Sequence, residues 1–339
     1  MAECLSSRHL DDLIQALRGE GYRVIGPTKG ELAIVYDDLR SAADLPIGWT
    51  DEQGPGHYRL KRRSDDAAFG YNVGPQSWKS FLFPPREELV QIRKKDDGVE
   101  WQRTEAEGAP MAFLGVRACE LAAMGIHDQV FTEGPYVDKR YGSRRERSFI
   151  VAVDCTEAGE LCFCASMKTG PRAEGDFDLR LTEMGEQFLV EAGTAAGRAV
   201  LDALPTTSAE AELEAEAARA LTACEESMGR SLDTHELPER LMGNLEHPAW
   251  ETLGERCLGC GNCTLACPTC FCFNIDDSSN LTGSEASRVR SWDSCFTADH
   301  SKIHGAQFRS EVTERYRQWA THKLGTWTSQ FGTSGCVGC

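Results

Sequence analysis

The chain has 339 residues, a formal net charge of −17 at pH 7 and 15 cysteines. Its length allows two domains of ordinary size, or one domain with a small additional module. The acidic charge argues against a nucleic-acid-binding protein and suits either docking on complementary partners or simple solubility. The N-terminus lacks a signal-peptide pattern and no apolar run approaches the length of a membrane span, so we expect a cytoplasmic protein without membrane contacts.

The first part of the chain predicts a helix, a hairpin and an irregular segment. Apolar residues at helical spacing in 10–17 predict an amphipathic helix. Two β-rich runs, 22–25 and 32–36, are separated by glycine and proline and predict a hairpin. Residues 46–85 are rich in glycine, proline and aromatic residues, so we expect irregular structure there. Lys79 lies in this segment; a solvated lysine is the usual case, and contact with an anionic partner is the alternative.

Four cysteines follow two buried strands that we expect at 112–116 and 148–153. They are Cys119, at the start of a helix directly after the first strand, and Cys155, Cys162 and Cys164, after the second. In open α/β sheets ligands bind outside the carboxyl ends of strands, and a helix N-terminus favours thiolates. These thiols therefore predict an extra cluster site. The alternative is a set of small buried apolar residues, because free cysteine is commonly buried.

A last strand, expected at 188–191, ends an N-terminal domain that spans residues 1–200. Residues 201–248 then form a helical connector. Residues 207–210 have the spacing of a capping box, and the helix that follows has an apolar stripe that includes Cys224. We interpret Cys224 as a buried member of that stripe. The acidic opposite face of the helix is expected to be solvated, with partner docking as the less favoured alternative.

The C-terminal region, residues 249–339, carries the strongest motif in the sequence. Residues 257–268 have the C-x2-C-x2-C-x3-C-P spacing of a bacterial-type ferredoxin loop. Gly259 and Gly261 allow the tight turns that bring thiolates to one face of a cubane. The fourth cysteine of such a run ligates the other cluster of a pair, and Cys336-Val-Gly-Cys339 repeats the opening of the motif. The ligands predicted from these motifs are Cys257, Cys260, Cys263, Cys267, Cys336 and Cys339.

A zinc ribbon and a disulfide framework both fit these cysteines less well. The ribbon needs two C-x2-C pairs on a long spacer, and nothing indicates an oxidising compartment for disulfides. Three further cysteines in this region are either fourth ligands or part of the dry shell around a cluster. They are Cys270 and Cys272, in a Cys-Phe-Cys sequence, and Cys295. A helix expected over 311–323 carries a basic patch that offsets cluster charge or docks an acidic partner. Its members are Arg309, Arg315, Arg317, His322 and Lys323.

Several of these motifs together resemble a known family. They are Val116-Arg-Ala-Cys-Glu120, the Cys-Phe-Cys at 162–164, residues 257–272, Trp292-Asp-Ser-Cys295, Arg315-Tyr-Arg317 with His322-Lys323, and residues 336–339. Over nearly the whole chain they resemble the iron–sulfur beta subunit of cytoplasmic group 3b [NiFe] hydrogenases, also called sulfhydrogenases. The corresponding subunit of anaerobic sulfite reductase is similar.

The resemblance implies an electron-transfer subunit without catalytic residues of its own. It would relay electrons through [4Fe-4S] clusters between the hydrogenase small and large subunits and a flavin/NAD(P)-binding reductase subunit. The alternative is the corresponding subunit of an anaerobic sulfite reductase complex, with sulfite reductase subunits as partners. A site that reduces sulfite would need a sirohaem, and no sirohaem-type four-cysteine signature is visible in the sequence. A third alternative is a binding or maturation module that carries a cluster only for structure, and such a cluster would not change its redox state.

Family members continue past the second motif with two more cysteines and a proline, so we expect the chain as given to be a fragment. Two [4Fe-4S] clusters are expected in the full-length protein, and three if the N-terminal cysteines hold one. The expected fold is an α+β or α/β N-terminal domain followed by a ferredoxin-like 4Fe-4S dicluster module that a long insertion interrupts. No G-x-G-x-x-G follows a predicted strand, so no cofactor-binding residues are expected beyond the cluster cysteines.

Overall fold

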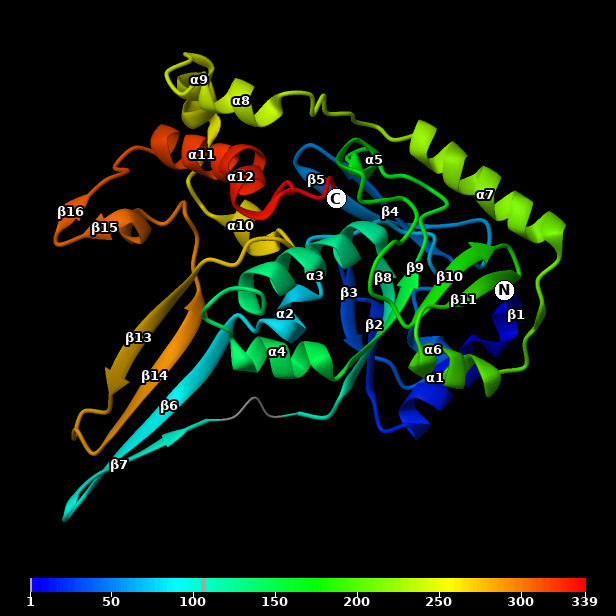
Figure 1. Ribbon diagram of the computed structural model, residues 1–339, viewed down its shortest axis with the longest axis horizontal. Coiled ribbons are helices and arrows are strands. Elements are labelled where there is room, and N and C mark those ends of the chain that lie inside the picture. The colour runs from blue at the N-terminus through cyan, green and yellow to red at the C-terminus, as the bar shows by residue number, and fades with distance from the viewer. Residues whose placement is uncertain (1, 105–107) are drawn as a thin grey trace.

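The computed structural model describes residues 2–104 and 108–339, and a large mixed sheet forms the centre of the molecule (Figure 1). The strand order is β12-β1-β11-β10-β9-β8-β2-β3. The strands are β1 (Glu3–Ser6), β2 (Arg23–Lys29), β3 (Ile34–Asp38), β8 (Met111–Arg117), β9 (Ser148–Val153), β10 (Leu179–Met184), β11 (Gln187–Ala192) and β12 (Thr207–Ser208). The central strands β2, β8, β9 and β10 are parallel neighbours, and the outer pairs are antiparallel. Strand β8 is buried along its whole length, as a central parallel strand must be.

Helices cover both faces of this sheet. They are α1 (Leu10–Gly19) and α6 (Ala195–Asp202) on one face, and α2 (Lys79–Leu82), α3 (Ala118–Phe131) and α4 (Lys139–Glu146) on the other. On the first face, Leu13 of α1 and Leu201 of α6 share a core with Leu114 of β8. On the second face, Leu121 of α3 shares a core with Phe113 of the same strand. The alternation of Phe113 and Leu114 between two cores follows from the two-residue repeat of a strand.

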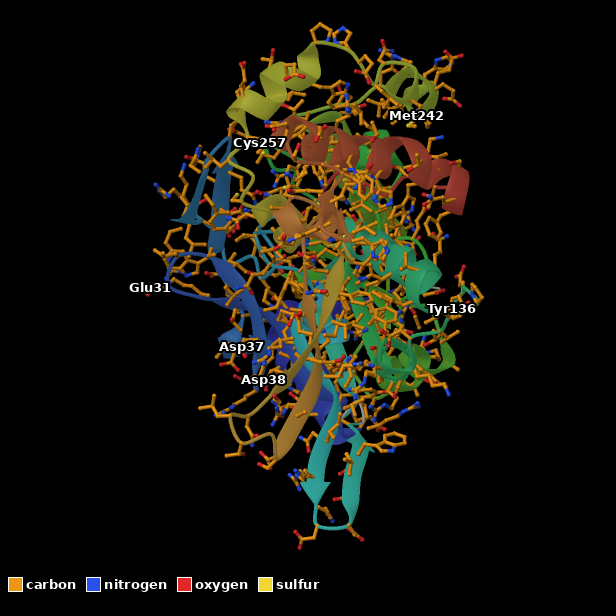
Figure 2. The ribbon with its side chains drawn as sticks, turned by 90° about the vertical axis from the view of Figure 1, so that its left-hand side faces the viewer. Glu31, Asp37, Asp38, Tyr136, Met242 and Cys257 are labelled. Carbon is orange, nitrogen blue, oxygen red and sulfur yellow. The ribbon has the colours of Figure 1, made fainter. Side chains whose placement is uncertain are left out.

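A second, four-stranded sheet joins two hairpins that lie far apart in the sequence. Its order is β13-β14-β6-β7. The strands are β6 (Arg86–Lys95), β7 (Gly98–Arg103), β13 (Phe273–Ser279) and β14 (Glu285–Trp292). We call this sheet the arm, because it projects from the rest of the molecule, away from the end where Cys257 lies (Figure 2). The insertion that interrupts the cysteine-rich region therefore pairs with a hairpin from the N-terminal part of the chain.

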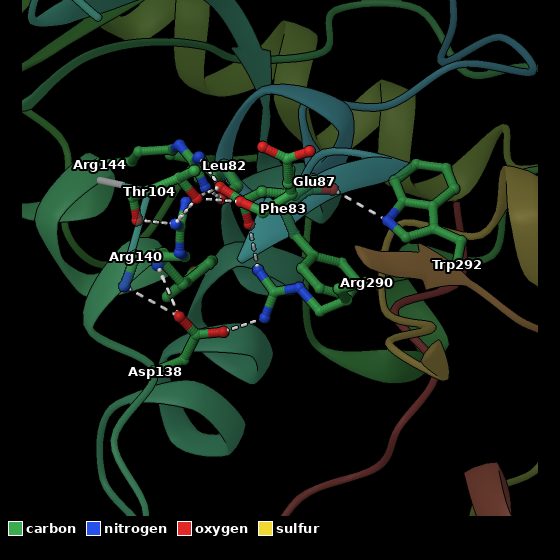
Figure 3. A network of polar contacts seen from close by, with 11 residues as sticks. Leu82, Phe83, Glu87, Thr104, Asp138, Arg140, Arg144, Arg290 and Trp292 are labelled. Atoms are coloured by element: carbon green, nitrogen blue, oxygen red, sulfur yellow. Dashed lines mark hydrogen bonds and ion pairs between the residues drawn. The ribbon is translucent and has the colours of Figure 1, made fainter. Parts of the chain in front are cut away.

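A buried ionic network fixes the base of the arm to α4 (Figure 3). Glu87 of β6 accepts hydrogen bonds from Arg290 of β14 at 2.6 Å and from Arg140 of α4 at 3.0 Å, and Arg144 also pairs with it. Burial alone would raise the pKa of Glu87, but the three arginines hold it below its ordinary value. Arg290 also pairs with Asp138, the N-cap of α4. Losing one partner would leave buried charge uncompensated, so the network holds both segments together.

The remaining elements are two hairpins, several short helices and the longer helix α7. The hairpins are β4 (Trp49–Gly54) with β5 (His57–Arg62), and β15 (Lys302–Ile303) with β16 (Ala306–Gln307). The helices are α5 (Cys164–Met167), α7 (Ala211–Glu226), α8 (Leu237–Met242), α9 (Ala249–Arg256), α10 (Asn262–Ala266), α11 (Val312–Thr321), a π-helix (His322–Thr326) and α12 (Trp327–Phe331). Single 3-10 turns cover Ser7–His9, Ala42–Asp44 and Ala298–Ser301. None of the described helices is long and apolar enough to span a membrane.

Two local predictions from the sequence were wrong. The segment 46–85, expected to be irregular, contains the β4–β5 hairpin, in which Trp49 pairs with Arg62 and carries that guanidinium over its ring. Thr207 does not begin the capping box of α7, because it pairs with Cys4 at the edge of the large sheet and Glu210 takes the N-cap position. In both places a strand pairing overrides the local sequence signal.

Candidate metal centre

The ferredoxin-type loop adopts the tight turns that its glycines predict. Gly259 and Gly261 have φ values of 63° and 75°, in the left-handed region that glycine tolerates. The Gly259 N–H donates to the Cys257 sulfur at 3.4 Å, the kind of bond that stabilises a thiolate. Cys260 and Cys263 are exposed, so this loop opens to the surface.

The second motif repeats this local conformation. Gly338 has a φ of 66°, and its backbone N–H acts to lower the pKa of Cys336, although burial raises that pKa overall. The two C-x-G-C segments are therefore alike in backbone as well as in sequence. Their surroundings differ, because Cys336 is partly buried and Val337 is fully enclosed between α3 and α12.

Lys323 organises the thiols around the second motif. Its ammonium lies 3.3 Å from the Cys267 sulfur, and donates to Thr269 Oγ1 at 2.5 Å and to the Gly335 carbonyl at 3.1 Å. Interaction between the two thiols lowers the pKa of Cys267 and raises that of Cys270. Burial and then the charges of Cys267 and Cys336 raise the pKa of Cys339. We call these four cysteines, Cys267, Cys270, Cys336 and Cys339, the second-motif group.

Lys79 lies beside the thiols, although the sequence favoured a solvated lysine at this position. It is only 5% exposed, so its interpretation as a solvated lysine was wrong. Its ammonium donates to the carbonyls of Leu265 and Cys267, each at 3.0 Å, and lies 4.0 Å from the centre of the Trp292 ring. Burial lowers the pKa of Lys79 to about 8, although the neighbouring thiols of Cys270 and Cys267 act to raise it. The position between Trp78 and Phe81 was the one available sequence signal, because those aromatic residues place α2 in the core.

The basic residues expected on one patch do not act as a single surface. Lys323 points inward from the π-helix, a rare turn that is frequent at functional sites. Three of the others bind internal groups: Arg315 donates to the Phe296 carbonyl at 2.8 Å, Arg317 to the Leu245 carbonyl at 2.7 Å, and Arg309 to Gln318 at 3.1 Å. Lys323 is therefore a buried cation beside thiols, whereas the three arginines bind groups of the chain itself.

The two cysteines of the C-terminal Cys-Phe-Cys lie in different surroundings. Cys270 joins the second-motif group, whereas Cys272 lies with Cys295 beside the first loop. Burial raises the pKa of Cys295 to about 12, and the charges of Cys272 and Cys263 act in the same direction. The first loop is tied to this turn by a hydrogen bond of 2.7 Å from Thr264 Oγ1 to Ser294 Oγ.

The structure also brings together the four N-terminal cysteines and adds a fifth. Cys119 and Cys155 follow β8 and β9 at neighbouring positions of the sheet, and Cys162 and Cys164 lie on the loop that follows. Cys224 of α7 reaches the same place: burial raises the pKa of its thiol to about 12, and the next contributions are the charges of Cys155, Cys164 and Cys162. Its burial in the helix stripe is confirmed. No sequence signal connects Cys224 with the other thiols, because three strands and a helix separate α7 from them.

The second motif packs directly on the N-terminal Cys-Phe-Cys loop. The Phe163 N–H donates to the Gly338 carbonyl at 2.9 Å, and Thr169 Oγ1 donates to the Val337 carbonyl at 2.6 Å. A β-carbon at Gly338 would lie 2.7 Å from the Phe163 carbonyl carbon and from the Cys164 nitrogen. The two groups of thiols are therefore joined by backbone contacts, although about 170 residues separate them along the chain.

Three buried cations test whether anionic clusters fit these thiols. Arg117, Lys79 and Lys323 are all buried beside cysteines, and none forms an ion pair within the described residues. Arg117 donates to the Tyr71 carbonyl at 2.9 Å and to the Asp154 carbonyl at 3.3 Å, but its Nε has no partner in the described part of the chain. Buried charges in proteins are normally paired. Cluster thiolates would supply the missing negative charge, so the residues present fit the group.

The geometry differs from that of a site for one metal ion. Across residues 2–104 and 108–339, no three cysteine, histidine or carboxylate side chains converge as ligands of a single ion would. A [4Fe-4S] cubane has a different requirement, because each thiolate binds a separate iron at a corner of the cluster. All of the cysteines are free thiols, available as ligands.

Comparison with known proteins agrees with the cluster chemistry. Residues 256–339 match the 4Fe-4S dicluster domain family. The chain is also similar to sulfhydrogenase 2 subunit beta of Pyrococcus furiosus, with 27% identity over 344 residues that cover 99% of this chain and 91% of that protein. No solved structure matches the chain significantly. The molecule is thus a mixed α/β protein with a 4Fe-4S domain at its C-terminus, and the resemblance to sulfhydrogenase beta subunits is confirmed.

Proposed function

We propose that this relative of sulfhydrogenase beta subunits is the electron-transfer iron–sulfur subunit of a [NiFe] hydrogenase complex. The observation that carries the proposal is the match along 99% of the chain to a sulfhydrogenase beta subunit, with the 4Fe-4S dicluster domain at residues 256–339. That relative favours the hydrogenase over the sulfite reductase alternative. The C-terminal module is proposed to have the ferredoxin-like arrangement, with catalysis left to other subunits.

The described residues support this function through the charge around the thiols. When bound, a [4Fe-4S] cluster supplies electron transfer at potentials set by burial, hydrogen bonds to sulfur and local charge. Cys257, Cys260 and Cys263 would hold one cluster. The second-motif group would hold the other, with Lys323 stabilising negative charge on Cys267. The buried ammonium of Lys79, which binds the carbonyl of the same cysteine, favours electron uptake there for the same reason.

We propose three partners in the cytoplasm: the hydrogenase small and large subunits, and a flavin/NAD(P)-binding reductase subunit. Electrons would pass through this chain between the reductase and the hydrogenase. The acidic surface, with a net charge of −17, suits docking on partners with complementary basic patches.

The test is anaerobic purification of the tagged chain from its native cells, followed by mass spectrometry of the proteins that accompany it. We expect the two hydrogenase subunits and a flavoprotein, and hydrogen-dependent reduction of NAD(P) by the complex. An untagged strain is the control. The isolated chain should contain iron and acid-labile sulfide but no flavin, and should not oxidise NADPH by itself. Recovery of sulfite reductase subunits instead, or flavin released from the pure chain, would contradict the proposal.

A further inference from the structure

We propose that Cys155, Cys162, Cys164 and Cys224 are the four ligands of a further [4Fe-4S] cluster in the N-terminal domain. Cys224 takes the place that Cys119 holds in the prediction from sequence. The cluster role rests on the proposed electron-transfer function, whereas the site itself rests on the positions of these residues.

Three of the ligands are placed by the carboxyl edge of the sheet and the loop beyond it. Cys155 follows β9 directly, and its N–H donates to the Pro171 carbonyl at 3.1 Å. The Cys162 N–H closes a turn on the Gly159 carbonyl at 3.1 Å, and Cys164 begins helix α5. The Cys-Phe-Cys sequence is therefore turned and not extended. Its two thiols are free to face one site, which an extended strand would forbid.

Helix α7 supplies the fourth ligand. Its C-terminal end packs on the Cys-Phe-Cys loop, because Met228 Sδ lies 3.9 Å from the Cys164 sulfur and accepts from the Ala165 N–H at 3.4 Å. The Arg230 N–H donates to the Cys162 carbonyl at 3.3 Å. Cys224 lies in the last turn of α7, four residues before Met228. Its side chain is only 2% exposed, so the thiol is enclosed by protein and not by solvent.

The charges that act on each thiol separate Cys224 from Cys119. After burial, the charges that raise the pKa of Cys224 are those of Cys155, Cys164 and Cys162, the other three members of the site. For Cys119 the first is Cys339 of the second motif, and Cys155 and Cys164 follow it. Cys119 also shares an apolar cluster with Val337 and Trp327. Cys119 therefore lies between the two groups of thiols, where it packs the contact between them.

Arg117 is an independent sign that an anion belongs in this place. Its side chain is 2% exposed, and among the described residues it has no carboxylate within ion-pair distance. Its guanidinium donates to the carbonyls of Tyr71 and Asp154, and Asp154 directly precedes Cys155. Among the described residues its buried Nε has no hydrogen-bond partner. A cluster with four thiolates carries negative charge, so it would compensate this buried cation.

The position of the site extends the path for electrons. The Phe163 N–H, between Cys162 and Cys164, donates to the Gly338 carbonyl of the second motif at 2.9 Å. A cluster on the N-terminal thiols would thus be the neighbour of the cluster on the second-motif group. Electrons would then pass from the cluster on the second-motif group to the N-terminal cluster, and so to the part of the molecule beside α7.

The experiment compares the full chain, purified without oxygen, with three variants. One carries both Cys155→Ala and Cys224→Ala, one carries Cys119→Ala, and the control carries Cys4→Ala on β1. Iron, acid-labile sulfide and the low-temperature paramagnetic resonance spectrum after reduction are measured for each. The double variant is expected to lose one cluster, about four irons per chain, and one of the resonance signals. The Cys119→Ala and Cys4→Ala variants are expected to keep the iron content and the resonance signals of the unaltered chain.

If the double variant does not fold, the single Cys224→Ser variant replaces it. Serine keeps the size of the side chain and is a weaker ligand, so one resonance signal should shift while the iron content stays close to that of the unaltered chain. An unchanged spectrum for Cys224→Ser, or iron loss with Cys119→Ala equal to that of the double variant, would overturn the proposal. Co-purification of hydrogenase subunits with the double variant distinguishes the two proposals, because it shows that the electron-transfer assembly stands even where this site fails.

Discussion

The two C-x-G-C motifs have the same backbone and very different surroundings. Gly259 and Gly338 share a φ near 65°, and each N–H lies where it stabilises negative charge on the first cysteine of its motif. The first motif opens to solvent at Cys260, whereas the second is enclosed by the Cys-Phe-Cys loop at 162–164 and by Lys323. The repeat therefore encodes the same turn twice, and the surroundings of each copy decide how far its thiols are enclosed and which charges lie beside them.

The largest effect is expected from removing the cation of the second motif. Lys323→Met would leave the Cys267 sulfur, Thr269 Oγ1 and the Gly335 carbonyl without their buried donor. We expect a loss of about 3 to 5 kcal/mol in the free energy of unfolding, and a loss of iron from one cluster. Denaturant unfolding without oxygen, with iron analysis, measures both. Lys302→Met, at an exposed lysine, is the control and should change stability by less than about 0.5 kcal/mol. Equal stability of the two variants would show that the enclosed motif does not depend on its cation.

A smaller effect is expected from adding a β-carbon to each glycine. Both positions are left-handed, so Gly259→Ala should cost about 1 kcal/mol, and its β-carbon would meet only Val312 Cγ2 at 3.3 Å. Gly338→Ala should cost about 3 kcal/mol, because its β-carbon would also lie 2.7 Å from the backbone of Phe163 and Cys164. Thermal unfolding of the two matched variants measures the difference. If they lose the same stability, the second motif does not pack against the Cys-Phe-Cys loop.

The smallest effect is expected from one hydrogen bond across the contact. Thr169→Val removes the bond from Thr169 Oγ1 to the Val337 carbonyl, 2.6 Å long, and should lower the free energy of unfolding by about 1 kcal/mol. Thr222→Val on the exposed side of α7 removes a bond within one helix and serves as the control, with an expected change below about 0.5 kcal/mol. Unfolding curves of both variants check the prediction. A control that loses as much as Thr169→Val would mean that the contact contributes nothing specific.

Local sequence patterns predicted the parts of the fold that local forces decide. The buried run 112–116 followed by a helix appears as β8 and α3, and the 22–36 hairpin appears as β2 and β3. The pairing of β6 with β14 left no such trace, because it joins strands from opposite ends of the chain and both strands are largely polar. Glu87 and Arg290 hold this pairing together. From the sequence they are indistinguishable from ordinary surface charges, because their side chains become buried only in the tertiary structure.

The cysteine sites show the same division. The turns at Gly259 and Gly261 follow from spacing alone. Alternate residues of an extended strand face opposite sides, so an extended Cys-Phe-Cys favours two separate surroundings for Cys270 and Cys272. Which thiols each cysteine approaches became known only from the tertiary structure. Cys224 and Lys79 reach thiols from elements that carry no cysteine motif, so their positions depend on how α7 and α2 pack. Contacts between distant elements are what a single sequence does not reveal.

The shared sheet of the arm has a consequence for the order of folding during synthesis. Glu87 and Arg290 are 203 positions apart, so at about 5 to 20 residues per second β6 emerges roughly 10 to 40 s before its partner β14. During that interval one edge of β6 has no neighbour, and an open edge invites pairing with other chains. Its sequence, with Arg86, Glu87 and Glu88 at one end and Arg93, Lys94 and Lys95 at the other, is of the charged kind that resists such pairing. The charges of β6 thus protect its open edge from pairing with other chains until the ferredoxin-type loop and then β14 have been synthesised.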